Sequence, residues 1–375
     1  MIKKKILIIT INKTVIDVFL NNHVQELSKK FQIEFLSSYK SNKIFIKKKY
    51  YKNNFVDLQR SIGLINFFKN IKEIFNIIKK NNPKIIISLH PKNGLLVAIS
   101  KIFYNFKNIH IITGQLWADK KYVPRFFFKC IDKYIIRTSD HLLIDSLSQI
   151  KFLKNEGFNT KKIKCINNGS ICGIDTKKFY KSKKNKIKFC KKNNWKVDEN
   201  IILFIGRINK HKGIFLLLEA FKILIDNNYK CNLLIVGNDE IYFKNFISKI
   251  NPKYKKRILI FNHKIDINYY YSLSSIFCLP SYREGFGMSV IEASSSLLPV
   301  VVSDIYGLND SCIKNKTGLK FKSGSSLDLV NKLKYLFNNP KKMKLFARNG
   351  KNFVDEKFNQ SDVSKFIFDF IKKIN

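Results

Sequence analysis

The chain has 375 residues, 45% of them hydrophobic, and is therefore long enough for two or three domains with buried cores. Its 70 lysine and arginine residues against 27 aspartate and glutamate residues give a net charge of +43, which attracts phosphorylated substrates, nucleic acids or an anionic membrane. Because the sequence lacks zinc-finger spacing, a basic region followed by heptads and an RNP-like aromatic pattern, we do not expect a nucleic-acid partner.

The cysteines and the apolar runs indicate the compartment. Seven cysteines are scattered without any C-x-x-C pair, a pattern that indicates neither a disulfide framework nor a zinc site. The apolar run before Thr10 is too short for a signal peptide, and no run reaches the ~18 apolar residues that span a bilayer. We therefore expect a cytoplasmic protein, soluble or peripheral, whose charge either serves a membrane contact or reflects a composition rich in Lys, Asn, Ile and Phe.

Residues 1–170 alternate between strand-like and helix-like stretches. Apolar runs predict strands at residues 5–9, 32–36, 84–89, 108–113, 141–145 and 162–166. With helices between most of them, this alternation predicts an N-terminal Rossmann-like domain, which is an open parallel sheet covered by helices on both faces. Residues 122–137 mix Phe and Tyr with Lys and Arg, and this fits either a membrane-interface helix or, more commonly, a packing helix with a charged outer face.

Three polar or aromatic residues follow strands of this half. His90 comes directly after the strand at 84–89, on the side where open parallel sheets bind ligands, although a strand-end histidine can also simply bond to backbone. Gln115 and Trp117 follow the strand at 108–113. An indole face stacks well on a sugar ring, so these two are candidate sugar or acceptor contacts, with packing inside the loop as the alternative for Trp117.

The second half begins after a basic stretch. Residues 171–199 begin with a polar, glycine-containing segment that can act as a hinge, so we expect an interdomain linker there. We expect the dense run of lysines within this range to be solvated surface. Strands are then predicted at residues 201–205, 232–236, 257–261, 276–279 and 300–303. Residues 200–357 therefore predict a second doubly wound domain, and residues 358–375 predict an amphipathic C-terminal helix.

The segment IGRINKHKG places two cations after the first strand of this second domain. Arg207 and Lys212 lie at the carboxyl end of the strand and just before a helix, where α/β sheets bind ligands. A guanidinium fork and an ammonium point charge suit a diphosphate. Because lysine and arginine are so frequent in this chain, a basic loop taken alone is weak evidence.

The segment LPSYREGFGMSVIEASSSLLP reads as strand, loop and helix. Glu284 lies in the loop, and Glu292 lies in the second turn of the helix. Backbone N–H groups at a helix start favour an anionic or hydroxyl-rich ligand. The residues at this helix start are Gly285, Phe286, Gly287 and Met288. Isolated glutamates are more often solvated surface acids than ligands, so the two segments are stronger evidence together than either is alone.

Together these two segments resemble motifs of the retaining glycosyltransferases of family 4. The resemblance is close in the C-terminal half and loose in the N-terminal half, where the loop after the first strand has no glycine. It implies the GT-B fold, with two doubly wound Rossmann-like domains facing a central cleft and a C-terminal helix, here residues 358–375, that crosses back to the first domain. It also implies sugar transfer, with retained configuration, from a nucleoside diphosphate sugar to a hydroxyl of a glycan acceptor, without a metal or other cofactor.

The resemblance also implies roles for individual residues. Arg207 and Lys212 correspond to the cations that bind the donor diphosphate, and the helix start at residues 285–288 completes the donor site. Glu284 corresponds to the catalytic acid that contacts the donor sugar, and Glu292 to the acid that holds the nucleotide ribose. His90 corresponds to a catalytic or sugar-contacting histidine, although its spacing to the neighbouring proline differs by one residue from the family pattern.

The acceptor follows from the same resemblance. The segments HPKNGLL, TGQLWADKK and NNGSICGID resemble bacterial members that build surface polysaccharides, such as lipopolysaccharide or capsule. This implies a polyprenyl-diphosphate-linked or other lipid-linked acceptor and peripheral contact with the anionic inner face of the cytoplasmic membrane. Two alternatives stay open: the same chemistry on a soluble acceptor, and a non-enzymatic protein that binds sugar nucleotides or polyanions.

Overall fold

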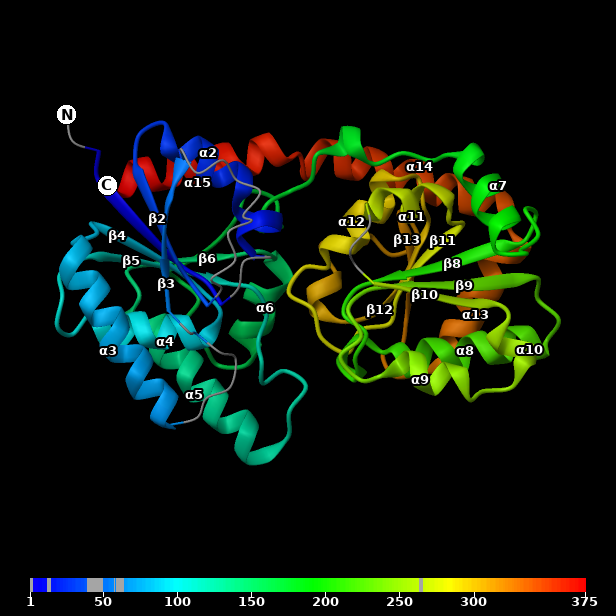
Figure 1. Ribbon diagram of the computed structural model, residues 1–375, viewed down its shortest axis with the longest axis horizontal. Coiled ribbons are helices and arrows are strands. Elements are labelled where there is room, and N and C mark those ends of the chain that lie inside the picture. The colour runs from blue at the N-terminus through cyan, green and yellow to red at the C-terminus, as the bar shows by residue number, and fades with distance from the viewer. Residues whose placement is uncertain (1–2, 12–14, 39–49, 57, 59–63, 263–265) are drawn as a thin grey trace. The chain divides into compact units, whose positions relative to one another are not determined.

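The computed structural model describes residues 3–11, 15–38, 50–56, 58, 64–262 and 266–375 (Figure 1). The chain forms two compact units. The first comprises Met1–Gly173 and Gln360–Asn375, and the second comprises Ile174–Asn359.

The described part of the first unit contains a seven-stranded parallel sheet in the order β3-β2-β1-β4-β5-β6-β7. Its strands are β1 (Lys5–Ile9), β2 (Gln32–Ser37), β3 (Lys52–Phe55), β4 (Ile85–Leu89), β5 (Lys107–Ile112), β6 (His141–Ile144) and β7 (Ile163–Cys165). The chain order reverses between β1 and β4, so ligands are expected at the carboxyl ends of these central strands.

Helices cover both faces of this sheet (Figure 1). They are α2 (Asn21–Ser28), preceded by the π-helical turn η1 (Ile16–Leu20), α3 (Leu64–Asn81), α4 (Pro91–Ser100), α5 (Tyr122–Thr138) and α6 (Leu147–Asn155). The C-terminal helix α15 (Gln360–Ile374) packs beside α2. There the buried His23 accepts a hydrogen bond from Ser364 Oγ at Nδ1 (2.9 Å) and donates one from Nε2 to Ile171 O (2.7 Å). The last helix therefore belongs to the first unit.

The described part of the second unit contains a six-stranded parallel sheet in the order β10-β9-β8-β11-β12-β13. Its strands are β8 (Asn200–Ile205), β9 (Cys231–Val236), β10 (Ile258–Phe261), β11 (Ile276–Leu279), β12 (Val300–Ser303) and β13 (Gly318–Phe321). The central strands are buried apolar runs, as expected when helices cover both faces. Here the order reverses between β8 and β11.

The helices of the second unit flank its sheet (Figure 1). They are α7 (Lys183–Lys192), α8 (Ile214–Asp226), α9 (Phe243–Ser248), α10 (Pro252–Lys255), α11 (Ile267–Leu273), α12 (Met288–Ser295), α13 (Ser326–Asn338) and α14 (Pro340–Lys357). Short 3-10 turns among the described residues of this unit are η3 (Thr176–Lys178), η4 (Lys210–Lys212) and η5 (Tyr306–Leu308). Two doubly wound α/β units are thus present, as the sequence predicted.

Most of the stretch that the sequence suggested as a linker, residues 171–199, is folded into the second unit. Helix α7 packs against α11, where Ser182 N donates to Ser272 O (2.8 Å). Phe189, Cys190 and Trp195 are buried in the core of the second unit. The sequence analysis did not predict α7, because a helix with so many lysines and so few apolar residues gives a weak periodic signal.

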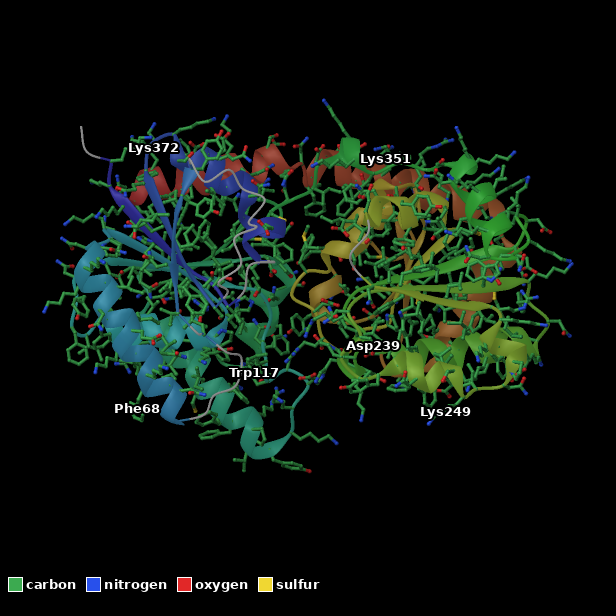
Figure 2. All side chains as sticks on the ribbon, viewed as in Figure 1. Phe68, Trp117, Asp239, Lys249, Lys351 and Lys372 are labelled. Carbon is green, nitrogen blue, oxygen red and sulfur yellow. The ribbon has the colours of Figure 1, made fainter. Side chains whose placement is uncertain are left out.

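Surface lysines, among them Lys249 and Lys372, carry the excess positive charge (Figure 2). In the described part of the chain, no helix combines the length and the apolar character needed to cross a membrane.

Candidate functional site

The loops that follow β8 and β11 carry the predicted cations and acids of the second unit. These strands are neighbours at the point where the chain order reverses, so their carboxyl-end loops lie side by side. Lys212 Nζ donates to Glu284 Oε1 at 2.5 Å, and Ser281 Oγ donates to the same oxygen at 2.7 Å. The side chains of Lys212 and Glu284 are only 19% and 10% exposed. The structure therefore brings these two predicted residues together in a largely buried ion pair.

Two glycines allow the loops around this pair to approach closely. Gly213 has a φ of +71°, and a Cβ there would lie 1.9 Å from Pro280 O. A Cβ at Gly307, after β12, would lie 2.0 Å from Glu284 O. The loops after β8, β11 and β12 are thus in backbone contact around Glu284, which only residues without side chains permit.

Arg207, at the start of the same basic loop, has a different partner. Its Nη1 lies 3.4 Å from both carboxylate oxygens of Glu240, which follows β9. The guanidinium is about half exposed. The structure therefore places Arg207 in the predicted loop but pairs it with Glu240, a residue that the sequence analysis missed.

Glu292 lies on α12 and accepts a hydrogen bond from Tyr271 Oη at 2.8 Å. Burial raises the pKa of Glu292 to about 7, and the hydrogen bond from Tyr271 opposes this rise because it stabilises the charged form. Tyr271 lies on α11 and is fully buried. The structure thus fixes Glu292 through Tyr271, a contact that the sequence did not indicate.

The start of α12 completes the loop after β11. Gly287 has a φ of +84° and precedes Met288, the first helical residue. A Cβ at Gly287 would lie 2.4 Å from Leu308 Cδ2, so this turn also requires glycine. The side chain of Phe286 is buried against Phe358, with ring centroids 5.1 Å apart. Of the predicted donor contacts at Gly285, Phe286, Gly287 and Met288, Phe286 can therefore offer a ligand only its backbone.

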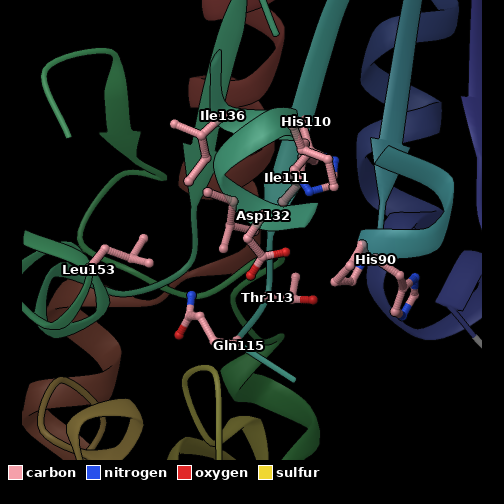
Figure 3. Close-up of a pocket in the computed structure, with 12 residues that line it drawn as sticks. His90, His110, Ile111, Thr113, Gln115, Asp132, Ile136 and Leu153 are labelled. Carbon is pink, nitrogen blue, oxygen red and sulfur yellow. The ribbon is translucent and has the colours of Figure 1, made fainter. Parts of the chain in front are cut away.

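In the first unit, a pocket lies at the carboxyl ends of β4 and β5 (Figure 3). It is lined by His90, Pro91, His110, Ile111, Ile112, Thr113, Gly114, Gln115, Asp132, Ile135, Ile136 and Leu153. His90 caps α4 with a φ of +72°, a conformation that is strained for a residue with a side chain. The amide of Gln115 donates from Nε2 to Gln149 Oε1 at 3.0 Å. The structure therefore brings His90 and Gln115, both predicted, to one pocket.

Two further titratable side chains line this pocket. His110 Nδ1 is hydrogen-bonded to Ser88 Oγ at 2.9 Å, and burial, reinforced by the nearby charge of His90, lowers the pKa of His110 to about 3. Burial raises the pKa of Asp132, on α5, to about 7. Figure 3 shows the Asp132 carboxylate among His110, Thr113 and Gln115. In the sequence, His110 and Asp132 were marked only as polar residues within apolar stretches.

Trp117 does not have the role that the sequence suggested. The indole is fully buried and is stacked on Phe158 with centroids 5.6 Å apart and on Phe152 with centroids 5.4 Å apart. Its Nε1 donates to Asp132 Oδ2 at 2.7 Å. Because aromatic rings cover the indole, the expected stacking on a sugar is wrong, and the packing alternative is correct.

Across the described ranges, no group of three or more His, Cys, Asp or Glu side chains is placed to hold a metal ion.

Comparison with protein families gives a match to the model for glycosyl transferases group 1 over residues 185–353. The chain is 27% identical over 310 residues to the capsular polysaccharide biosynthesis glycosyltransferase CapM of Staphylococcus aureus, covering 81% of this chain and 80% of that one. It is 29% identical over 296 residues to the N,N'-diacetylbacillosaminyl-diphospho-undecaprenol alpha-1,3-N-acetylgalactosaminyltransferase of Campylobacter jejuni, with 75% of each chain covered.

Solved structures resemble the whole chain. Sucrose-phosphate synthase from Thermosynechococcus elongatus superimposes with a TM-score of 0.84 at 18% identity, covering 99% of both chains. Anabaena HepE in complex with UDP gives a TM-score of 0.80 at 14% identity, covering 99% of this chain and 100% of that one. These likenesses confirm the predicted GT-B fold.

Proposed function

We propose, because residues 185–353 match the model for glycosyl transferases group 1, that the chain moves a sugar from a nucleoside diphosphate sugar to a hydroxyl of a lipid-linked glycan. The transfer proceeds with retention of the anomeric configuration and without a metal. The observation that supports this most is the buried pair of Lys212 and Glu284 at the carboxyl ends of β8 and β11. A cation and an acid meet there at the place where α/β sheets bind ligands.

The leaving diphosphate sets the main physical task of the site. Negative charge builds on it as the sugar departs, and preorganised cations in a water-poor site stabilise that charge. Lys212 and Arg207 supply two cations from one loop. The donor diphosphate competes with Glu284 for the Lys212 ammonium. Glu284, still hydrogen-bonded to Ser281, can then accept hydrogen bonds from the sugar hydroxyls.

Glu292 serves the nucleotide end of the donor. A carboxylate accepts hydrogen bonds from both hydroxyls of a ribose, and Tyr271 holds this carboxylate in place. His90, Gln115 and the newly found Asp132 lie at the carboxyl end of the first sheet, in a pocket that we assign to the acceptor side. His90 is the catalytic or sugar-contacting histidine there.

The relatives in S. aureus and C. jejuni are named for capsular polysaccharide and for a diphospho-undecaprenol substrate. A polyprenyl carrier is membrane-bound, so we place this protein at the inner face of the cytoplasmic membrane as a peripheral enzyme. The surface of α5 supports this placement. The exposed fractions of Tyr122, Val123, Phe126 and Phe127 are 85%, 76%, 71% and 55%. Apolar side chains gathered beside Lys120 and Lys121 are typical of a membrane-binding surface.

The activity is tested by incubating the protein with a panel of nucleoside diphosphate sugars and a polyprenyl-diphosphate-linked glycan. We expect one donor to be consumed, with a product whose new bond keeps the anomeric configuration of the donor by NMR, also in the presence of a chelator. Donor binding without transfer to any lipid-linked or soluble acceptor would instead support a non-enzymatic binding protein. Transfer with inversion, or transfer abolished by the chelator, would overturn the stereochemical or the metal-free part of the proposal.

The membrane contact is tested by sedimentation with phosphatidylglycerol-containing vesicles. We expect the double variant Phe126→Ser, Phe127→Ser to bind about 10-fold more weakly than the wild type, because each phenylalanine contributes roughly 1.5–3 kcal/mol when fully buried and less when partly inserted. The matched control is Leu327→Ser, which removes an equally exposed apolar side chain from α13. A wild-type protein that does not bind these vesicles at low salt would favour a soluble acceptor.

A further inference from the structure

We infer that Glu240 is a positioning residue of the donor site, which holds Arg207 directly and holds the Lys212 turn through Asn209. The inference rests on the proposed function, because it treats Arg207 and Lys212 as the cations that bind the donor diphosphate. Glu240 comes from the loop after β9, outside both sequence motifs.

The backbone fixes this loop against the basic loop. Pairing between β8 and β9 continues past the strand ends, where Gly206 N donates to Val236 O (3.0 Å) and Glu240 N donates to Ile208 O (3.1 Å). A Cβ at Gly237 would lie only 1.7 Å from Gly206 O. The two loops therefore lie in close backbone contact, which places the main chain of Glu240 beside the basic loop.

The carboxylate of Glu240 then joins two side chains of the basic loop. Its Oε2 accepts from Asn209 Nδ2 at 2.8 Å, and both of its oxygens lie 3.4 Å from Arg207 Nη1. Asn209, which is only 7% exposed, accepts the backbone N–H of Lys212 at Oδ1 (3.0 Å). One carboxylate is thus linked to Arg207 by charge and to the Lys212 turn by a bridging amide.

The neighbouring acid, Asp239, anchors the loop that carries Glu240. Asp239, labelled in Figure 2, accepts backbone N–H groups from Ile241 (3.2 Å), Phe243 (2.9 Å) and Lys244 (3.0 Å). Burial raises the pKa of Asp239, but these three bonds and the nearby charge of Lys244 together outweigh burial, so the pKa lies below its usual value. The loop that presents Glu240 is therefore held from both sides, by Ile208 and by the start of α9.

The negative charge of Glu240 and its positioning of the basic loop have opposite effects on donor binding, so the two effects can be distinguished by experiment. A carboxylate beside Arg207 repels the incoming diphosphate, so a purely electrostatic Glu240 would weaken donor binding. A half-exposed ion pair is also worth little for stability. The hydrogen bond from buried Asn209 to Glu240 favours a positioning role. Loss of this bond leaves the Asn209 amide without its acceptor and loosens the Lys212 turn.

The test measures calorimetric Kd values of the full chain for UDP, ADP and GDP, and uses whichever binds the wild type most tightly. We expect Glu240→Ala and Asn209→Ala each to raise this Kd about 10-fold, and the double variant to be no weaker than either single one, because both remove the same link. Glu240→Gln, which keeps an acceptor oxygen for Asn209, should stay within about threefold of the wild type. Glu219→Ala, an exposed acid on α8, is the control and should leave the Kd unchanged.

Each outcome supports or overturns either the proposed function or the inference about Glu240. If the wild type binds none of the three nucleoside diphosphates, the proposed function fails and the inference fails with it. If the wild type binds but Glu240→Ala and Asn209→Ala remain within twofold, only the inference is overturned. If Glu240→Gln is as weak as Glu240→Ala, the charge and not the position matters, and the inference is also overturned. Should Glu240→Ala not fold, Asn209→Ala and Glu240→Gln decide by the same limits.

Discussion

Replacing Gly213 by alanine separates the geometry of the donor site from its chemistry, because no charged or polar side chain changes. Gly213 has a φ of +71°, and an alanine there would bring its Cβ to 1.9 Å from Pro280 O. Ordinary van der Waals contact is about 3.5 Å, so the two loops must separate by more than about 1 Å. This shift moves Lys212 away from Glu284, which lies in the loop that Pro280 begins.

The expected loss in activity follows from that shift. A misplacement of about 1 Å can lower a rate about 100-fold, and we expect a loss of this size in donor turnover by Gly213→Ala. The left-handed backbone costs an alanine about 1–2 kcal/mol, and overpacking adds about 1–3 kcal/mol. The loss in turnover is measured in a transfer assay, and the loss in the free energy of unfolding is measured by urea unfolding.

Gly324 is the matched control. Its φ of +83° is similar, yet a Cβ there would meet only Tyr282 Cε1 at 3.6 Å, an ordinary contact. Gly324→Ala should therefore cost about 1–2 kcal/mol of stability and leave turnover within a few-fold of the wild type. If Gly213→Ala and Gly324→Ala were equally active, the close approach of the two loops would not matter for the reaction.

Two predictions concern buried carboxyl groups. Because burial raises the pKa of Glu292 from 4.5 to about 7, the folded state binds a proton that the unfolded state has released, so stability should fall as the pH rises from about 5 to 7. Glu292 contributes at most about 1.4 kcal/mol per pH unit to the slope of the free energy of unfolding against pH. Urea unfolding of Glu292→Gln at several pH values should show a slope without this contribution. A slope equal to that of the wild type would contradict the argument from burial. Trp117→Phe removes the hydrogen bond to Asp132 and should lower the free energy of unfolding by about 1–3 kcal/mol while leaving the donor KM unchanged; a raised KM would show that Trp117 acts in the donor site.

The sequence predicted the strands that are apolar and missed those that are not. Strands β3 and β13, with sequences KNNF and GLKF, lie at sheet edges and carry polar residues or glycine in place of an apolar run. Each of these two strands has too few consecutive apolar residues for hydrophobic periodicity to indicate it. Helix α7 was missed for a related reason, since lysines dominate its sequence.

The sequence predicted only those site residues that lie within short local motifs. Lys212 and Glu284 were found because each lies just after a strand, in a short segment with its own glycines. Glu240 and Asp132 were missed because their importance arises from contacts with residues far away in the chain, which no local pattern records. The role of Trp117 stayed open between two alternatives, because a loop tryptophan that binds sugar and one that packs inward look the same in a sequence.

The central claim is that Lys212 and Glu284 together form the donor site, and turnover by charge-removing variants tests it most directly. We predict that Lys212→Met and Glu284→Gln each lower donor turnover about 100-fold or more. Lys210→Met, which removes an exposed lysine of the same loop, should have turnover close to that of the wild type. Undiminished transfer by the folded Lys212→Met and Glu284→Gln proteins would contradict the claim.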